Sequence, residues 1–264
     1  MTEIIHAAFT ARGIWQVGVC AFSACLPLLE VRVKSRLPAN PQSVIVCALP
    51  YYTGDYPQRN VARYAICDDY HKAGGEILQD ISQQLAQALP GYAFVPFIDV
   101  SPIREVHAAF LAGLGVVGLH GQLITEQWGG YVFIGCIVTD LDLPPSQPVG
   151  GGCDECQSCV LACPTGALSP GGLDVQRCRS YITQKKGGLT DWEAQQLRAG
   201  KMAWGCDICL DTCPHSKSAP TPLECLTRAP LPILTRDNLE AALKLKSYGY
   251  RGRAVLERNL KLID

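Results

Sequence analysis

The sequence predicts a mixed fold, in which an α+β or α/β domain is followed by a small cysteine-rich domain of ferredoxin-like type. In the N-terminal half, apolar runs of strand length alternate with helix-like periods, which is typical of packed helices and strands. In the second half, eight of the 14 cysteines gather at short spacings. A chain of 264 residues that is 48% hydrophobic is long enough to form two such domains.

The first elements follow from residue periods and stop signals. Residues 4–12 have a helical pattern, and residues 15–22 and 43–50 are apolar runs of strand length. A long helix is expected next, capped by Asp68 or Asp69, because an apolar residue recurs at every fourth position. These apolar residues are Ile77, Ile81, Leu85 and Leu89.

A second group of elements completes the N-terminal half. Residues 93–100 read as a strand, and Pro102 is expected to open a short helix that ends at Leu111. Residues 122–126 and 131–141 are predicted strands joined as a hairpin. The pattern therefore predicts a sheet with helices beside it.

Residues 143–152 contain three prolines and three glycines, which is typical of a linker. We therefore predict a first domain over residues 1–148, a double-cluster domain over residues 149–230 and a C-terminal helical extension over residues 231–264.

The clustered cysteines have the spacing of iron–sulfur ligands. The leading run, Cys-x2-Cys-x2-Cys-x3-Cys-Pro, is the bacterial ferredoxin spacing, in which the fourth cysteine binds the other cluster. The second run begins at Cys206 and ends at Pro214, and it needs ligands from elsewhere in the chain. Crossed donation then predicts two [4Fe-4S] clusters. One is assigned to Cys153, Cys156, Cys159 and Cys213, and the other to Cys163, Cys178, Cys206 and Cys209.

Two other uses of these cysteines fit the sequence less well. Four-cysteine zinc sites also use Cys-x2-Cys pairs, but they gain nothing from four cysteines within eleven residues followed by proline. Disulfides are disfavoured because the N-terminus shows no secretory signal, which predicts a reducing cytoplasm. The other six cysteines are expected to be small buried residues. They are Cys20, Cys25, Cys47, Cys67, Cys136 and Cys225.

Charge and hydropathy exclude further classes. No apolar run reaches the roughly 18 residues of a membrane span, so no membrane association is expected. A net charge of −1 argues against a dedicated nucleic-acid binder. Basic residues do gather near the C-terminus, where a solvated helix face or a phosphate contact would explain them. They are Lys244, Lys246, Arg251, Arg253, Arg258 and Lys261.

Several sequence blocks carry a resemblance to a known family. They lie at residues 43–52, 62–65, 69–71, 98–102, 112–115 and 135–141, and residues 177–183 look like the segment with the isolated ligand. On these blocks and the cysteines, the chain resembles the epoxyqueuosine reductase family, cobalamin-dependent iron–sulfur enzymes related in architecture to reductive dehalogenases. The resemblance covers nearly all 264 residues.

This resemblance implies that the N-terminal domain binds cobalamin and that electrons pass through both clusters to cobalt and then to a substrate. An external donor of ferredoxin or flavodoxin type would supply them. Tyr64, His71, Asp99 and Cys136 are the implied cofactor contacts.

Asp99 is the predicted proton donor. It follows an apolar strand, where desolvation would raise the pKa of a carboxyl and keep it protonated near neutral pH. A helix cap before Pro102 is the alternative. His71 also completes an Asp-x-His-x-x-Gly pattern with Asp69 and Gly74, found in some corrinoid domains, but a helix start explains it better.

The chain departs from the family at several positions. Leu119 and His120 stand where members have lysine and asparagine, Cys136 replaces a glutamate, and His215 follows the last ligand where tryptophan is usual. The chain also stops at Asp264, where a helical-repeat tRNA domain would begin in full-length members.

Three functions follow, in order. The first is a cobalamin-dependent reductase of an unknown substrate. The second is a short-form epoxyqueuosine reductase acting on tRNA, for which the neutral charge and the missing repeats leave weak support. The third is a non-catalytic electron carrier, which would not need about 150 further residues.

Overall fold

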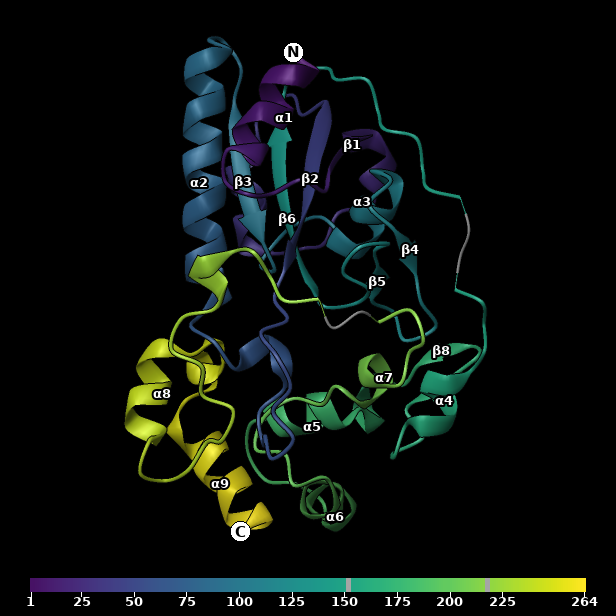
Figure 1. The fold of residues 1–264 in the computed structure, drawn as a ribbon, viewed down its shortest axis with the longest axis vertical. Helices are drawn as coiled ribbons and strands as arrows, with labels where there is room; N and C mark the ends of the chain where they lie inside the picture. Colours follow the sequence, from purple (N-terminus) through teal and green to yellow (C-terminus); the bar gives the residue numbers. More distant parts are fainter. Residues whose placement is uncertain (151–152, 217–218) are drawn as a thin grey trace. The chain divides into compact units, whose positions relative to one another are not determined.

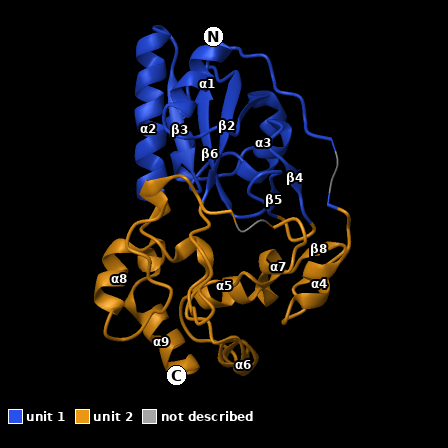
Figure 2. Ribbon diagram, viewed as in Figure 1, with its two compact units in different colours: residues 1–50, 71–118, 122–153 blue, residues 51–70, 119–121, 154–264 orange. Residues whose placement is uncertain are grey.

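The computed structural model describes residues 1–150, 153–216 and 219–264. The chain forms two compact units (Figure 2). Unit 1 comprises residues 1–50, 71–118 and 122–153, and unit 2 comprises residues 51–70, 119–121 and 154–264. Residues 51–70 therefore fold with the cysteine-rich unit, although they precede most of unit 1 in sequence. The domain limits drawn from the sequence stay predictions.

Unit 1 is built on a four-stranded antiparallel sheet with the order β1-β2-β6-β3 (Figure 1). The strands are β1 (Val17–Ala21), β2 (Ser43–Pro50), β3 (Phe94–Ile98) and β6 (Val132–Thr139). Val46 of β2 pairs with Cys136 of β6, and Ile98 of β3 pairs with Gly135. Every residue of β2 is buried, which explains its nearly continuous apolar sequence.

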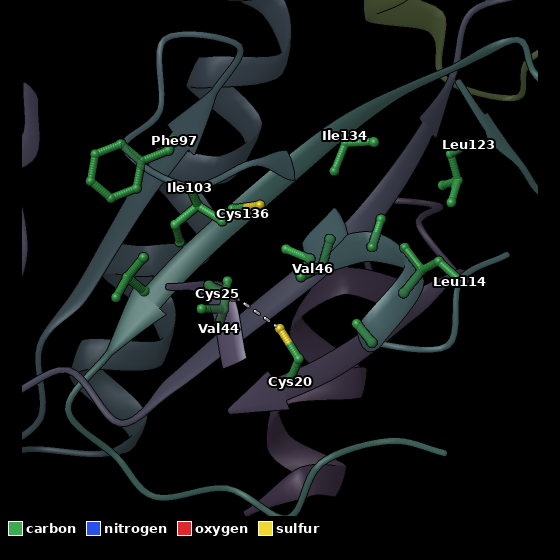
Figure 3. Close-up of a cluster of buried hydrophobic side chains, with 14 of the residues drawn as sticks. Cys20, Cys25, Val44, Val46, Phe97, Ile103, Leu114, Leu123, Ile134 and Cys136 are labelled. Carbon is green, nitrogen blue, oxygen red and sulfur yellow. Dashed lines mark hydrogen bonds between the residues drawn. The ribbon is translucent and has the colours of Figure 1, made fainter. Parts of the chain in front are cut away.

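Helices cover both faces of this sheet. They are α1 (Thr2–Thr10), α2 (Tyr70–Ala88) and α3 (Glu105–Leu111). On one face, a Cβ at Gly135 would lie 2.8 Å from Leu78 of α2, so the glycine lets this helix approach closely. On the other face, Ala108 and Ala109 of α3 belong to the same buried cluster as Val46 and Cys136. Figure 3 labels Val46 and Cys136 in this cluster.

Shorter elements complete unit 1. They are the pair β4 (Val116–Val117) and β5 (Leu123–Ile124) and the 3-10 turns Phe22–Cys25 and Arg32–Arg36.

Unit 2 consists of short helices around a second core. Its helices are α4 (Ser158–Ala162), α5 (Arg179–Gln184), α6 (Asp191–Gly200), α7 (Ile208–Asp211), α8 (Leu239–Leu245) and α9 (Arg253–Ile263). A small ribbon joins β7 (Leu168–Ser169) to β8 (Gly172–Leu173), and the 3-10 turns are Arg63–Ala65, Val175–Arg177, Glu224–Leu226 and Ser247–Arg251. Trp204, Tyr248 and Leu256 are almost completely buried at its centre.

The mixed fold predicted from the sequence is confirmed, with two local differences. Helix α3 begins at Glu105 instead of Pro102, because the Ile103 N–H bonds to the Ser101 hydroxyl in a turn before the helix. The predicted hairpin is wrong: β5 pairs with β4, while β6 pairs with β2 and β3. Only the turn forms, through backbone bonds between Thr125 and Gly129.

The predicted linker has no helix or strand over residues 143–150, and residues 151–152 lie outside the described part. None of the helices described is both long and apolar enough to cross a membrane.

Candidate functional site

All eight predicted cluster ligands lie among the described residues, and short helices of unit 2 present several of them. Cys159 is on α4 and Cys209 is on α7, and these two helices pack together. Cys178 immediately precedes α5. The folded chain thus draws cysteines from its two separate runs toward one region of unit 2.

One predicted ligand set is supported by contacts among its members. Burial raises the pKa of Cys209 to about 12, and the nearby Cys206 and Cys178 thiols add to this rise. The loop of Cys163 is tied to the same place, since Arg177 donates from Nε to the Thr165 carbonyl over 3.0 Å. Arg177 precedes Cys178, and Thr165 follows Cys163 by two residues. These contacts favour joint binding by Cys163, Cys178, Cys206 and Cys209.

A second contact supports the crossed ligand of the other set. His215 Nε2 lies 2.8 Å from Asp154 Oδ2. Asp154 lies in the loop before Cys156, and His215 follows Cys213 by two residues. The histidine that departs from the family pattern therefore holds the turn after Cys213 against the first cysteine loop. The ligand role of each cysteine, including Cys153, stays a prediction.

The donor chemistry fits iron–sulfur clusters. Thiolates are soft ligands of the kind that such clusters use. Within the described ranges, no group of three or more His, Cys, Asp or Glu side chains is arranged to hold a single metal ion. Since ligation needs the thiolate form, cluster binding must offset the burial that raises the pKa of Cys206 and Cys209.

A separate polar group lies beyond the end of β3 in unit 1. Asp99 has a φ of 59°, in the left-handed region that few residues other than glycine adopt. Its Oδ2 lies 2.9 Å from Nε2 of His71, at the start of α2. The Asp99 side chain is 58% exposed and that of His71 is 30% exposed. The predicted desolvation of Asp99 is therefore wrong, because the chain turns outward where the strand ends.

The desolvated carboxyl belongs instead to Glu105, the first residue of α3. Its Oε2 accepts a hydrogen bond from the Asp99 backbone N–H over 3.1 Å, and its Oε1 is buried with no partner among the described residues. Burial, and secondarily the charge of Asp99, raises the pKa of Glu105 to about 8. Sequence reasoning missed this residue. The available signal was an acid six positions after Asp99, at the start of a helix.

The remaining predicted contacts, Tyr64 and Cys136, belong to different units. In unit 2, Tyr64 accepts a 2.8 Å hydrogen bond from Trp204 Nε1. His120 is buried, which lowers its pKa. In unit 1, Cys136 has no exposed surface and lies in the sheet core (Figure 3). Cofactor contact by Tyr64 and Cys136 stays a prediction.

Burial of the six other cysteines is confirmed for all but one. Cys225 is only half-buried, whereas the rest are buried. The buried ones are Cys20, Cys25, Cys47, Cys67 and Cys136.

Two family models match the chain. One is described as a 4Fe-4S double cluster binding domain and matches residues 152–216, a range that includes all eight predicted ligands. The other is described as epoxyqueuosine reductase QueG and matches residues 32–100. The double-cluster prediction is therefore confirmed at the level of the domain.

Curated relatives extend the similarity. An epoxyqueuosine reductase of Bacillus anthracis is 31% identical over 255 residues, covering 88% of this chain and 66% of the relative. One from Lactococcus garvieae is 32% identical over 217 residues, covering 78% of this chain and 61% of the relative. One from Escherichia coli is 37% identical over 158 residues, covering 60% and 41%. The chain thus spans between about two fifths and two thirds of these relatives' lengths.

Solved structures agree on the fold. An epoxyqueuosine reductase from Streptococcus thermophilus matches with a TM-score of 0.84 and 21% identity, over 99% of this chain and 80% of that one. An epoxyqueuosine reductase with an epoxyqueuosine-modified tRNA stem loop matches with a TM-score of 0.80 and 24% identity, over 99% and 80%. A catabolic reductive dehalogenase matches with a TM-score of 0.56 and 20% identity, over 97% and 37%.

Proposed function

Because the chain belongs to the epoxyqueuosine reductase-like family, we propose that it is an iron–sulfur oxidoreductase that reduces epoxyqueuosine in tRNA. The observation that carries this proposal is similarity to epoxyqueuosine reductases over 88% of the chain, through both units. Action on tRNA would also fit the cytoplasmic location that the cysteines predict.

This proposal reverses the order of candidates drawn from the sequence. There, an unknown substrate came first because the net charge is −1 and the chain stops at Asp264. The position of the last residue is not evidence about the substrate. The curated relatives described above are epoxyqueuosine reductases, which favours tRNA. A different substrate remains the second candidate, favoured by the departures at Leu119 and His120.

The residues divide the chemistry between them. Removing an epoxide oxygen as water consumes two electrons and two protons, and the two clusters can carry the electrons one at a time. Asp99 is the proposed relay that passes both protons in turn to the oxygen that leaves, because its exposed carboxyl can take up protons from solvent and lies against His71. His71 orients that carboxyl through the 2.9 Å contact.

Cobalamin is the proposed third redox group, and when bound it would supply a strongly reducing cobalt centre. A reductive dehalogenase, whose structure suggests a mechanism for B12-dependent dehalogenation, shares the fold with a TM-score of 0.51 and 19% identity. In this chain, the support is the polar pair of His71 and Asp99 beyond β3. Both side chains are partly exposed, so a bound cofactor and a substrate can contact them. An external electron donor is proposed as well.

The test uses anaerobically purified protein with its clusters rebuilt. We would add cob(II)alamin, a chemical reductant and an epoxyqueuosine-containing tRNA stem loop, and then quantify nucleosides by mass spectrometry. Queuosine is expected only when the corrinoid is present, with stem-loop binding that weakens steeply as salt is added. No queuosine from protein whose clusters are reduced would contradict the proposal.

The same sample separates the other candidates. A change of the cob(II)alamin EPR spectrum to its base-off form without queuosine would favour another substrate. Reducible clusters with an unchanged spectrum would favour the electron carrier.

A further inference from the structure

Asp99 is held from two sides within unit 1. Its carboxyl contacts His71 of α2 at 2.9 Å, and its backbone N–H bonds to Glu105 Oε2 of α3 at 3.1 Å. The residue adopts a left-handed φ of 59°. Such a conformation persists only where the surrounding structure determines it. The two contacts are therefore candidates for what fixes the Asp99 carboxyl in position.

The burial of the Glu105 carboxyl is unusual for an acid at a helix start. Acids in the first helical turn are normally exposed to water, and their negative charge interacts favourably with the helix dipole. The Glu105 carboxyl is instead enclosed, and its Oε1 has no partner in the part of the chain that the structure describes. Four titratable groups interact electrostatically with it, each from a different segment. They are Asp99 after β3, His71 on α2, Cys47 on β2 and Cys136 on β6.

This enclosure suits a neutral carboxyl. An ionised carboxylate with an unpartnered buried oxygen is costly, whereas a protonated acid can still accept a hydrogen bond through its carbonyl oxygen. The pKa of about 8, raised by burial first and by Asp99 second, agrees with a proton held at neutral pH. Its Oε2 then offers the Asp99 amide a hydrogen-bond acceptor at 3.1 Å.

We propose that Glu105 is a positioning residue, whose Oε2 holds the Asp99 backbone N–H and thereby keeps the Asp99 carboxyl beside His71. This inference rests on the proposed function only for the role that it gives Asp99 as proton donor. A glutamine at position 105 would offer a similar carbonyl oxygen, whereas a methionine would fill similar volume without one.

A purely structural role for Glu105 makes a different prediction. If the residue only stabilised the first turn of α3, its loss would expose the amides of that turn and leave the Asp99 amide protected. The positioning role requires the Asp99 amide to lose protection selectively. The two roles are therefore separable at single amides.

The test is hydrogen–deuterium exchange on the anaerobic full chain with both clusters rebuilt, resolved to single residues by fragmentation. The variants are Glu105→Gln, Glu105→Met and Glu105→Ala, with His107→Ala as the control, since His107 is exposed on the same helix. Exchange at the Asp99 amide should accelerate tenfold or more in the Met and Ala variants. It should stay within about twofold of wild type in the Gln variant and in the control.

An unchanged Asp99 amide in the Met variant would overturn the proposal, as would exposure confined to α3. The Met variant preserves volume, so it decides the question even where the alanine variant fails to fold.

Turnover of the epoxyqueuosine stem loop gives an independent readout. The Met variant should lower kcat by about tenfold or more while leaving KM unchanged, and the Gln variant should restore kcat. If wild type is active and neither the Asp99 amide nor kcat responds, the positioning role fails and the proposed function stands. If wild type makes no queuosine, the proposed function fails, and exchange at Asp99 still decides the role of Glu105.

Discussion

The two units differ in how far apart in sequence their candidate functional residues lie. In unit 2, seven of the eight predicted cluster ligands come in two short runs. The contact of His215 with Asp154 ties the two runs together, and the contact of Arg177 with Thr165 ties the segment of Cys178 to the first run. In unit 1, the polar group is assembled from residues on three different elements, His71, Asp99 and Glu105. The predicted cluster ligands are therefore recognisable largely from local spacing, whereas the position of the proposed proton donor depends on tertiary structure.

Removing one cluster ligand should give the largest effect. The Cys206→Ser variant is expected to lose one cluster, so bound iron should fall from about eight to about four atoms per chain. The Cys225→Ser variant is the control, because this half-buried cysteine lies outside the ligand set. Iron analysis of anaerobic samples checks both, and a full iron complement in Cys206→Ser would refute the ligand assignment.

The second-largest effect is expected in unit 1, where the free energy of unfolding should depend on pH. The pKa of Glu105 is raised to about 8, so the folded protein keeps a proton that the unfolded chain releases above about pH 4.5. The contribution of Glu105 to the free energy of unfolding is therefore complete below about pH 4.5, and it is lost progressively as the pH rises through about 8. Between pH 6 and 8 the loss should be about 2–3 kcal/mol.

The Glu105→Gln variant should lack this loss, which anaerobic thermal unfolding of both proteins at pH 6, 7 and 8 would show. Parallel pH profiles for the two proteins would mean that Glu105 is already ionised at pH 6.

In unit 2, Arg63 fastens residues 51–70 to α7. It donates to Asp211 Oδ1 at 2.9 Å, to Asp55 Oδ1 at 3.1 Å and to the Gly54 carbonyl at 2.9 Å. Since its side chain is only 11% exposed, Arg63→Ala should cost about 2 kcal/mol of unfolding free energy.

The matched control is Arg236→Ala, whose ion pair with Asp264 is exposed and should contribute less than about 1 kcal/mol. Denaturant unfolding compares the two, and equal losses would show that the Arg63 contacts stabilise the fold no more than an exposed ion pair does.

The smallest effect is expected at Cys136. Cys136→Ala removes one buried sulfur from the sheet core and should cost about 1–2 kcal/mol. The EPR spectrum of added cob(II)alamin should not change, because the thiol has no exposed surface. A spectrum that differs from wild type would restore the cofactor contact predicted from the sequence.

Sequence reasoning predicted those features that depend on local order. The strand that became β2 and the helix that became α2 were visible as an apolar run and a four-residue period. The double-cluster domain was visible as cysteine spacing. The hairpin prediction failed because β6 finds its partners in β2 and β3, which lie far away in sequence.

Burial of individual side chains was the least predictable property. Asp99 was expected to be desolvated because it follows an apolar strand, yet the left-handed turn at this residue exposes it. Glu105 lies at a helix start, where acids normally face water, yet its carboxyl is enclosed. Neither result follows from a residue's immediate neighbours in sequence.

The central claim is that the clusters deliver electrons while Asp99 delivers a proton. Its most direct test is queuosine formation by the Asp99→Asn variant, with iron content and cluster reduction measured by EPR in the same anaerobic samples. Unchanged iron and reducible clusters, with queuosine formation about 100-fold slower or more, are expected. Queuosine formation at the wild-type rate by Asp99→Asn would contradict the account.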